Sequence, residues 1–532
     1  MMTKIKGMFE KLGRAERFLF FLLLALFLIA VVAFLLPLIM FGTKVPVRNY
    51  DSNFIIQLIN SDFGDFFDVL NFVKNRDPYT DAPLYGDIAN YPPLGYAVFW
   101  LFSLIPGMAG QEMSIESPLG LVSMLLYLLV FTVPFGITLY RRLSKFHRLT
   151  RILLLCAVFT SYPFYFCIGR MNMNLMSVFF AFYFIVWYND KNKIKRQLSL
   201  VSLSIAGMTK VYPLFLGVML LRDHRWRDVF LTVLYCVLLF FLPFFLFHGG
   251  LSNIREMLSY MAEFSGEAIG FNKNDISFNK LLRSVILLLG FGSGNAIPVV
   301  TSVLADLLFL FSCAALVFTK NNFRFTMLAT LAYLNLPNVN YTYSLVFLIV
   351  PFYIYLQEEV FTEGEKNKEN KVLITISAIS VSYLTCVFML SVSLLVLGIV
   401  LIIKKYCQKP IMIIVLSIGA VGTILLLYLV FSSLFTVGYV NNAKYGYQIG
   451  LGSTVFCMQL LLLVLAGIEM KNRISLKRKH STEETEYADK RICGNDKDQC
   501  SEDDGQIRSL AYSKYFIGNR YCGNTLQRCA AV

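Results

Sequence analysis

The sequence predicts an all-α membrane protein with many transmembrane helices. Of its 532 residues, 57% are apolar and only 15% are charged, and the mean hydropathy is +0.61. Apolar runs long enough to cross roughly 30 Å of hydrocarbon as helices recur along most of the chain. Short clusters of Lys and Arg separate these runs. We therefore expect about 11 to 13 membrane helices embedded in a lipid bilayer.

The formal net charge of +14 arises from these short basic clusters. Such clusters are typical of the cytoplasmic ends of membrane helices, so the charge does not indicate a nucleic-acid partner. Most of the 11 Cys lie within or beside apolar segments, and those in the polar tail have no regular metal-ligand spacing. The sequence has no Walker A loop and no dinucleotide fingerprint. We expect no cofactor and no metal site.

The first apolar run follows Arg17 and predicts a retained helix. It is too long for a signal peptide and lacks a small-residue cleavage site. The basic residues of 1–17 place the N-terminus in the cytoplasm. Residues 42–117 then form a large first extracytoplasmic loop, and 118–140 returns to the cytoplasmic side. A further crossing between these two helices would leave the basic residues after 140 on the outer side. The apolar piece 94–106 is therefore expected to be interfacial or re-entrant.

The same charge argument organises the middle of the chain. Both ends of the apolar stretch after Arg196 are basic, so this stretch must return to the cytoplasmic side as two short helices broken around Gly207 to Pro213. This break places Lys210 within the membrane region. The other expected segments are an outward run at 152–168, an inward run ending at 191–196, an outward run at 229–247, a second outer loop at 248–296, an inward run at 297–319, and the pair 325–336 and 343–356.

Three or four further crossings complete the membrane domain, which we assign to residues 18–469. The tail 470–532 is charged and poor in apolar residues, so we expect a disordered cytoplasmic extension. The protein is thus expected in the cell membrane as a multi-pass protein with both termini in the cytoplasm.

Three acids in the first outer loop suggest chemistry. Asp62, Asp65 and Asp68 recur every three residues between phenylalanines, and on a helix they would share one broad face. One interpretation is a solvated loop helix with acids near its N-terminus. The other is a general base whose pKa is raised by neighbouring acids and aromatic burial. The second is favoured by the anchoring helix before the acids and the stiff step Tyr91-Pro92-Pro93 after them.

A series of motifs extends from this loop through the chain. In order, they are DFGDFFD, DPY at 77–79, YPPL at 91–94, GRMNMNLM at 169–176, TKVYPLFL at 209–216, RDHRWRD at 222–228 and ISFNKLLR at 276–283. This series resembles the family 87 integral membrane glycosyltransferases of the GT-C fold. The resemblance covers residues 50–356 and leaves out the last helices and the tail.

The resemblance implies an inverting transfer of a sugar from a polyprenyl-phosphate donor to an acceptor on the outer face. One acid of the first outer loop would act as general base. Asp62 fits the family by its distance from DPY, whereas Asp65 fits the DFF version of the motif, and Asp68 is the third choice. A single carboxylate would suffice, because a sugar phosphate already carries a good leaving group. We expect a mannose-like hexosyl donor and a lipid-linked or cell-surface glycan as acceptor.

The remaining site residues also come from the motifs. Donor phosphate would be met by cations, since an intramembrane charge is costly unless it is used; ordinary snorkelling is the alternative for each of them. The candidate cations are Arg170, Lys210, Lys280 and Arg283. The candidates for cavity lining and positioning are Tyr79, Tyr91, Pro92, Pro93, Asn174, Tyr341 and Tyr343.

The sequence departs from the family in the outer turn between Asn335 and Ser344. The family often has Ser-Pro and one or two His there, and this chain has NLPNVNYTYS. Tyr341 or Tyr343 could donate a hydrogen bond to phosphate but supplies no positive charge. The contact with the donor headgroup, and with it the identity of the donor, is therefore left open.

Two other classes of function fit parts of the sequence. A lipid or oligosaccharide transporter would also use broken helices like the one near Lys210. Against it, the chain has no two-fold repeat, and its acids are concentrated in one outer loop. A glycan polymerase is the third interpretation.

Overall fold

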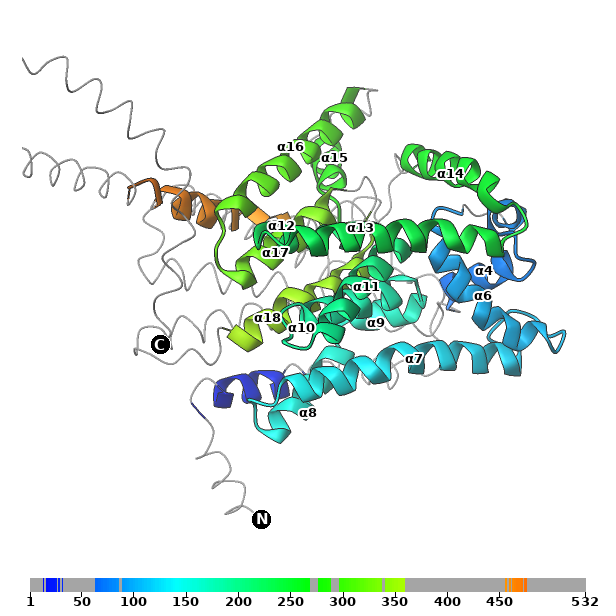
Figure 1. Ribbon diagram of the computed structural model, residues 1–532, viewed down its shortest axis with the longest axis horizontal. Helices are drawn as coiled ribbons and strands as arrows, with labels where there is room; N and C mark the ends of the chain where they lie inside the picture. Colours follow the sequence, from blue (N-terminus) through cyan, green and yellow to red (C-terminus); the bar gives the residue numbers. More distant parts are fainter. Residues whose placement is uncertain are drawn as a thin grey trace, which may run out of the picture. The chain divides into compact units, whose positions relative to one another are not determined.

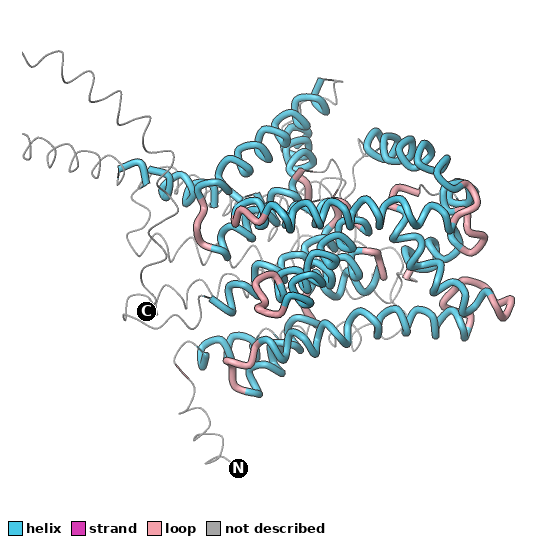
Figure 2. The backbone as a smooth tube through the Cα atoms, viewed as in Figure 1, coloured by secondary structure: helices cyan, strands magenta, loops and turns pink. Residues whose placement is uncertain are grey.

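The computed structural model describes residues 63–85, 89–267, 276–288, 296–336 and 340–358, together with parts of 13–31 and 455–475. The chain divides into two compact units, residues 1–468 and 469–532. Within the described residues every regular element is a helix, as the sequence predicts (Figures 1 and 2). The predicted tail lies almost entirely outside the described residues, although 470, 471 and 473–475 are helical.

The first unit contains α-helices and short 3-10 helices, the latter labelled η. In chain order they are α4 (Gly64–Val73), α5 (Pro78–Asp81), η2 (Ala82–Tyr85), α6 (Pro93–Gly107), α7 (Pro118–Arg142), α8 (Arg148–Phe159), α9 (Tyr162–Arg170), α10 (Asn174–Trp187), α11 (Lys193–Thr209), η3 (Tyr212–Gly217), α12 (Val218–Arg222), α13 (Trp226–Phe241), η4 (Leu242–Leu246), η5 (Gly250–Ser252), α14 (Asn253–Glu267), α15 (Phe278–Leu288), α16 (Ala296–Phe318), α17 (Asn322–Asn335), η6 (Thr342–Leu348) and α18 (Ile349–Glu358).

Local sequence explains where many of these helices begin. Pro93 and Pro118 open α6 and α7, at a position where the missing N–H has no helical partner to lose. Ser117 caps α7 by accepting a hydrogen bond from the Gly120 amide at 3.2 Å. Asn192 caps α11 in the same way. These starts are fixed by residues within a few positions of each helix.

Helices α10 and α17 form the centre of the first unit. Both are buried on nearly every side, which is typical of a helix whose residues are apolar all round. Helix α10 packs against α11, α7 and α18, while α17 packs against α16, α18 and η3. The N-terminal end of α10, at Asn174, belongs to the candidate site described below.

Three peripheral helices are long and apolar enough to cross a membrane within the described residues. They are α7, α13 continued by η4, and α16, with 25, 21 and 23 residues. Only 33%, 22% and 28% of their apolar windows are buried. Exposed apolar faces of this size are stable in lipid rather than in water. The helices therefore indicate a membrane protein, while the total number of crossings stays a prediction.

Two expected runs are interrupted. The outward run at 152–168 consists of α8 and α9, which meet at Thr160 and Ser161. Pro163 in the first turn of α9 has no N–H with which to continue the preceding helix. The predicted break near Lys210 is confirmed, because α11 ends at Thr209 and η3 begins at Tyr212.

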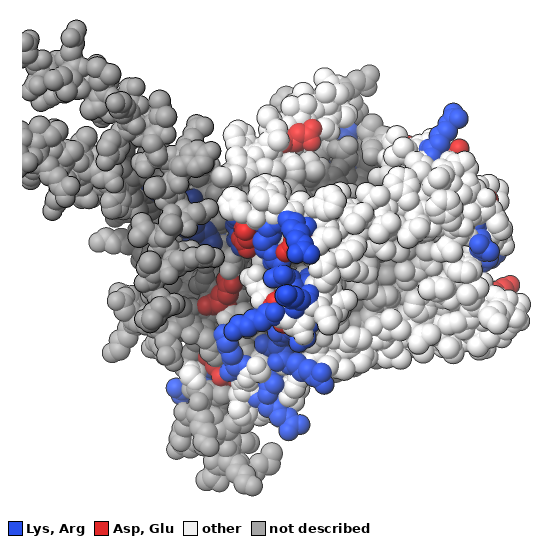
Figure 3. Space-filling model, in the orientation of Figure 1, with Lys and Arg blue, Asp and Glu red and all other residues white. Residues whose placement is uncertain are grey.

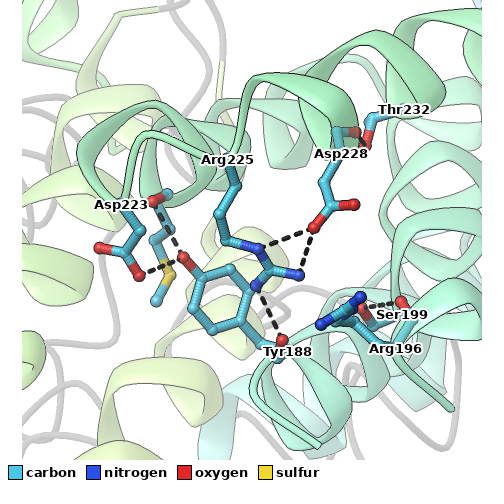
Figure 4. Close-up of polar contacts among 8 residues, drawn as sticks. Tyr188, Arg196, Ser199, Asp223, Arg225, Asp228 and Thr232 are labelled. Carbon is cyan, nitrogen blue, oxygen red and sulfur yellow. Dashed lines mark hydrogen bonds and ion pairs between the residues drawn. The ribbon is translucent and has the colours of Figure 1, made fainter. Parts of the chain in front are cut away.

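Lys and Arg gather at one end of the helices of the first unit (Figure 3). Arg142 at the end of α7 lies 3.2 Å from Asp190 in the turn between α10 and α11. The Arg225 guanidinium donates to the Tyr188 carbonyl at 2.9 Å, and the Tyr188 hydroxyl bonds to Asp223 (Figure 4). The basic segments that the sequence places on one side are therefore neighbours in space.

The described part of the predicted first outer loop lies at the opposite end. Helix α6 packs against α4 and also against η4, which continues α13 away from its basic start. The Arg76 side chain, just beyond α4, donates to the Leu246 carbonyl at 2.7 Å, and the His248 amide donates to the Arg76 carbonyl at 2.9 Å. Which side of the membrane each end faces stays a prediction.

Candidate active site

Asp65 stands in the first turn of α4, and aromatic packing fixes the rotation of that helix. The side chain of Phe66 is fully buried, with ring centroids 5.5 Å from Phe99 and 5.3 Å from Tyr127. With this face held against α6 and α7, the Asp65 side chain is only 17% exposed. Asp68, on the same helix, is exposed. The structure thus separates two acids that the sequence places on one broad face.

Asp65 binds two groups from the end of α9. Its Oδ1 forms an ion pair with Arg170, and its Oδ2 accepts a hydrogen bond of 2.7 Å from the Asn172 amide. Between them Met171 adopts a left-handed backbone conformation with φ of 48°, which turns the chain and lets both neighbours reach the carboxylate. The Asn172 amide also lies 3.2 Å from the Tyr91 hydroxyl. Asp65 is therefore surrounded by donors.

The sequence interpretation expected neighbouring acids and aromatic burial around the general base. The described neighbours of Asp65 are a guanidinium and an amide. Asp62, the other candidate base, lies outside the described residues.

Lys210 lies where α11 ends. Its backbone is extended, with φ of −151° and ψ of 115°, and Pro213 follows in the first turn of η3. Its Nζ is 5.0 Å from the ring centroid of Tyr91, 5.6 Å from that of Tyr212 and 5.2 Å from that of Tyr343. Cation–π contacts of this length stabilise an ammonium without using its N–H donors. Within the described part of the chain, no carboxylate lies within ion-pair distance of Nζ.

A buried hydrogen-bond network supports these residues. The Tyr212 hydroxyl donates to Asn174 Oδ1 at 3.1 Å and lies 3.2 Å from Ser344 Oγ. The Asn174 amide contacts the same Ser344 Oγ at 3.4 Å. The network joins the start of α10 to η3 and η6, and so fixes the two segments that carry Lys210 and Tyr343. The sequence pointed to Asn174 but not to Tyr212 or Ser344, although Tyr212 belongs to the TKVYPLFL motif.

The predicted aromatic and proline residues hold Tyr91 in place. The buried Tyr79 donates its hydroxyl to the Tyr91 carbonyl at 3.1 Å. Pro92 and Pro93 then start α6 directly after Tyr91. Tyr341 lies with its ring 5.4 Å from that of Tyr343. These predicted positioning residues therefore lie within one continuous set of contacts.

Lys280 and Arg283 occupy a different position. Both are buried on α15, which packs against α16. Their segment is tied to the segment before η6, because the Ile276 amide donates to the Asn340 carbonyl at 2.7 Å. Within the described ranges, Arg283 makes no contact with Asp65, Arg170 or Lys210. Their role in donor binding stays a prediction.

The set of side chains suits the recognition of a phosphate beside a carboxylate. Arg170 and Lys210 supply positive charge, and Asp65 supplies a proton acceptor. Among the residues that the structure describes, no group of three or more His, Cys, Asp or Glu side chains could hold a metal ion.

The family model for glycosyltransferase family 87 matches residues 90–337. The chain is a glycosyltransferase. The matched region of this glycosyltransferase contains Tyr91, Arg170 and Lys210, while Asp65 on α4 precedes it. Comparison with curated proteins and with solved structures gives no match.

Proposed function

We propose that this glycosyltransferase moves a mannose-like hexosyl group from a polyprenyl-phosphate sugar to a lipid-linked or cell-surface glycan on the extracytoplasmic face. The membrane helices suit a donor with a lipid tail, and the family match gives the class of reaction. The observation that carries the proposal is the ion pair between Asp65 and Arg170, close to a Lys210 side chain that is surrounded by tyrosine rings. This pairing brings together two residues that lie 105 positions apart in the sequence.

In the proposed step Asp65 acts as general base. It takes the proton of the acceptor hydroxyl while that oxygen bonds to the anomeric carbon. The bond from the anomeric carbon to the phosphate oxygen breaks in the same displacement, and its electron pair leaves with the phosphate. A single displacement inverts the configuration of the sugar.

Arg170 and Lys210 would bind the departing phosphate. Its negative charge grows as the bond breaks, so positioned cations stabilise the transition state more than the ground state. A bound phosphate would also compete with Asp65 for Arg170. Once Arg170 turned toward the phosphate, the Asp65 carboxylate would be free to accept a hydrogen bond from the acceptor hydroxyl. Arg170 is suited to this exchange because its side chain is 44% exposed.

The experiment is sugar transfer by the purified protein from radiolabelled polyprenyl-phosphate sugars to lipid extracts, with products identified by mass. We expect Asp65→Asn to lower the rate by about 10²- to 10⁴-fold, the usual contribution of a general base. The exposed Asp68→Asn variant is the matched control and should retain the normal rate.

The same assay decides between the two candidate bases. A normal rate for Asp65→Asn together with an inactive Asp62→Asn would transfer the role to Asp62. If both variants transfer sugar normally, the general-base mechanism is wrong. Absence of transfer from every polyprenyl-phosphate sugar would reject the proposed donor class.

A further inference from the structure

Helix α16 has an inward face whose partners are known. Thr301, Ala305, Leu308, Ser312 and Leu316 are buried at helical spacing, and α15 and α17 pack against this helix (Figure 1). The Thr301 hydroxyl donates to Asn279 of α15 at 2.5 Å. The Ser312 hydroxyl accepts a hydrogen bond of 2.8 Å from Gln459. Thr301 and Ser312 on this face therefore form hydrogen bonds with other residues of the protein.

The outward face of α16 is apolar apart from one acid. Val299, Val303 and Leu310 are 64%, 50% and 61% exposed. Asp306 falls between them in the repeating spacing of a helix stripe and is also exposed. It is the one charged residue of this 23-residue helix and lies at its middle. A carboxylate therefore stands near the centre of a candidate membrane span.

An acid at this depth needs a partner. Placing a charged side chain at the centre of a bilayer is unfavourable, and such residues usually pair with another polar or charged group. In the described ranges of the chain no basic side chain lies within ion-pair distance of Asp306. The inward-facing polar groups of α16 already bond elsewhere. The requirement is therefore for a positive charge that reaches the outward face from another helix.

Four apolar stretches that lie largely outside the described residues carry no such charge. Residues 18–43, 372–403, 410–443 and 445–468 contain no Lys, Arg or His. A second copy of the chain, joined about a two-fold axis through this face, would bring two Asp306 carboxylates together. Like charges in a medium of low dielectric constant repel strongly. Neither source supplies the missing partner.

We propose that the outward face of α16 binds a transmembrane helix of a different membrane protein, one with a Lys or Arg at the middle of its span. The valines and leucine around Asp306 would pack against this helix. The ion pair would set its depth and select it among other apolar helices. This inference is independent of the sugar-transfer mechanism, because none of the residues of the candidate active site takes part.

A designed helix tests the proposal. The full-length protein, fused to a fluorescent protein, is reconstituted in liposomes with dye-labelled synthetic peptides of Leu and Ala that span the bilayer. The peptides differ only at the central residue, which is Lys, Leu or Glu. Energy transfer between the protein and the peptide measures their association.

The Lys peptide should bind saturably, whereas the Leu and Glu peptides should not. Asp306→Asn should weaken binding of the Lys peptide by about 3- to 18-fold, the range measured for polar pairs between membrane helices. Asp306→Lys should reverse the preference and bind the Glu peptide. Asp190→Asn, at the basic end of the unit, is the control and should bind as the unchanged protein does.

Several results would overturn the proposal. They are equal binding of the three peptides, or an Asp306→Asn variant that binds the Lys peptide normally. A dimer of the unchanged protein that dissociates in Asp306→Asn would assign the face to a second copy instead. If Asp306→Lys does not fold, the nearly isosteric Asn variant decides the question.

Discussion

Replacing Lys210 by Met should separate stability from activity, because the two properties depend on this side chain with opposite sign. Taking an ammonium out of water costs several kcal/mol. The three tyrosine rings at 5.0, 5.6 and 5.2 Å offset part of this cost, since each such contact is worth about 0.5–2 kcal/mol. Met keeps the apolar stem without the charge. The free energy of unfolding of Lys210→Met should therefore be unchanged or higher by about 1–2 kcal/mol.

Transfer activity should fall in the same variant. If Lys210 binds the departing phosphate, its loss resembles removal of one oxyanion-hole donor and lowers the turnover rate by about 10²- to 10³-fold. Thermal unfolding in detergent and the initial rate of sugar transfer measure the two effects. Lys193→Met, an exposed lysine at the start of α11, is the matched control and should change neither. A variant that unfolds at lower temperature, with a normal rate in its folded fraction, would show that Lys210 has only a structural role.

Three further outcomes follow from the contacts. Tyr212→Phe should destabilise the protein by about 1–3 kcal/mol, because two buried polar groups lose a hydrogen-bond partner; a thermal midpoint equal to that of the unchanged protein would contradict this. Gly120→Ala should prevent normal folding, since its Cβ would lie only 2.1 Å from the Ser114 carbonyl oxygen, and gel filtration in detergent would detect the misfolded protein. The Asn192 amide and then Arg142 hold the pKa of Asp190 below its ordinary value. Asp190 therefore adds stability above about pH 4 that is lost as the pH falls through its lower folded pKa; thermal midpoints measured against pH should show this loss, and Asp190→Asn should abolish it.

Sequence reasoning succeeded where a local signal determines the structure. The helical class, the basic end and the break near Lys210 follow from hydropathy, charge and Pro213. The motifs also named Asp65, Arg170 and Lys210, which the structure links through Asn172 and Tyr91, while their roles stay a prediction. These residues share motifs that lie at the ends of apolar runs, so their convergence at one end of the helices could be anticipated.

Other features depend on packing between distant segments. The choice between Asp65 and Asp68 is set by the burial of Phe66 between α6 and α7, which composition does not disclose. The ion pair with Arg170 depends on the left-handed turn at Met171, an uncommon conformation for a non-glycine residue. Such features become visible only when the helices are placed together.

Asp306 is a different case, because its signal was present in the sequence. A single acid stands inside the apolar run of α16, and this pattern alone marks a residue with a special role. The structure adds which way the helix faces. It shows that the acid points away from the protein interior instead of into it.

The contacts between Asp65, Arg170, Asn174 and Ser344 have a consequence for biosynthesis. The chain is made from its N-terminus, and the hydrogen bond from Asn174 to Ser344 joins positions 170 apart. A ribosome must deliver α4, α9, the start of α10 and η6 to the translocation machinery before the last of these partners can meet. Until then, each newly inserted polar side chain lacks the hydrogen-bond or ion-pair partner that it has in the folded protein. The maturing enzyme therefore acquires its chemistry late, and chains that terminate early should lack it altogether.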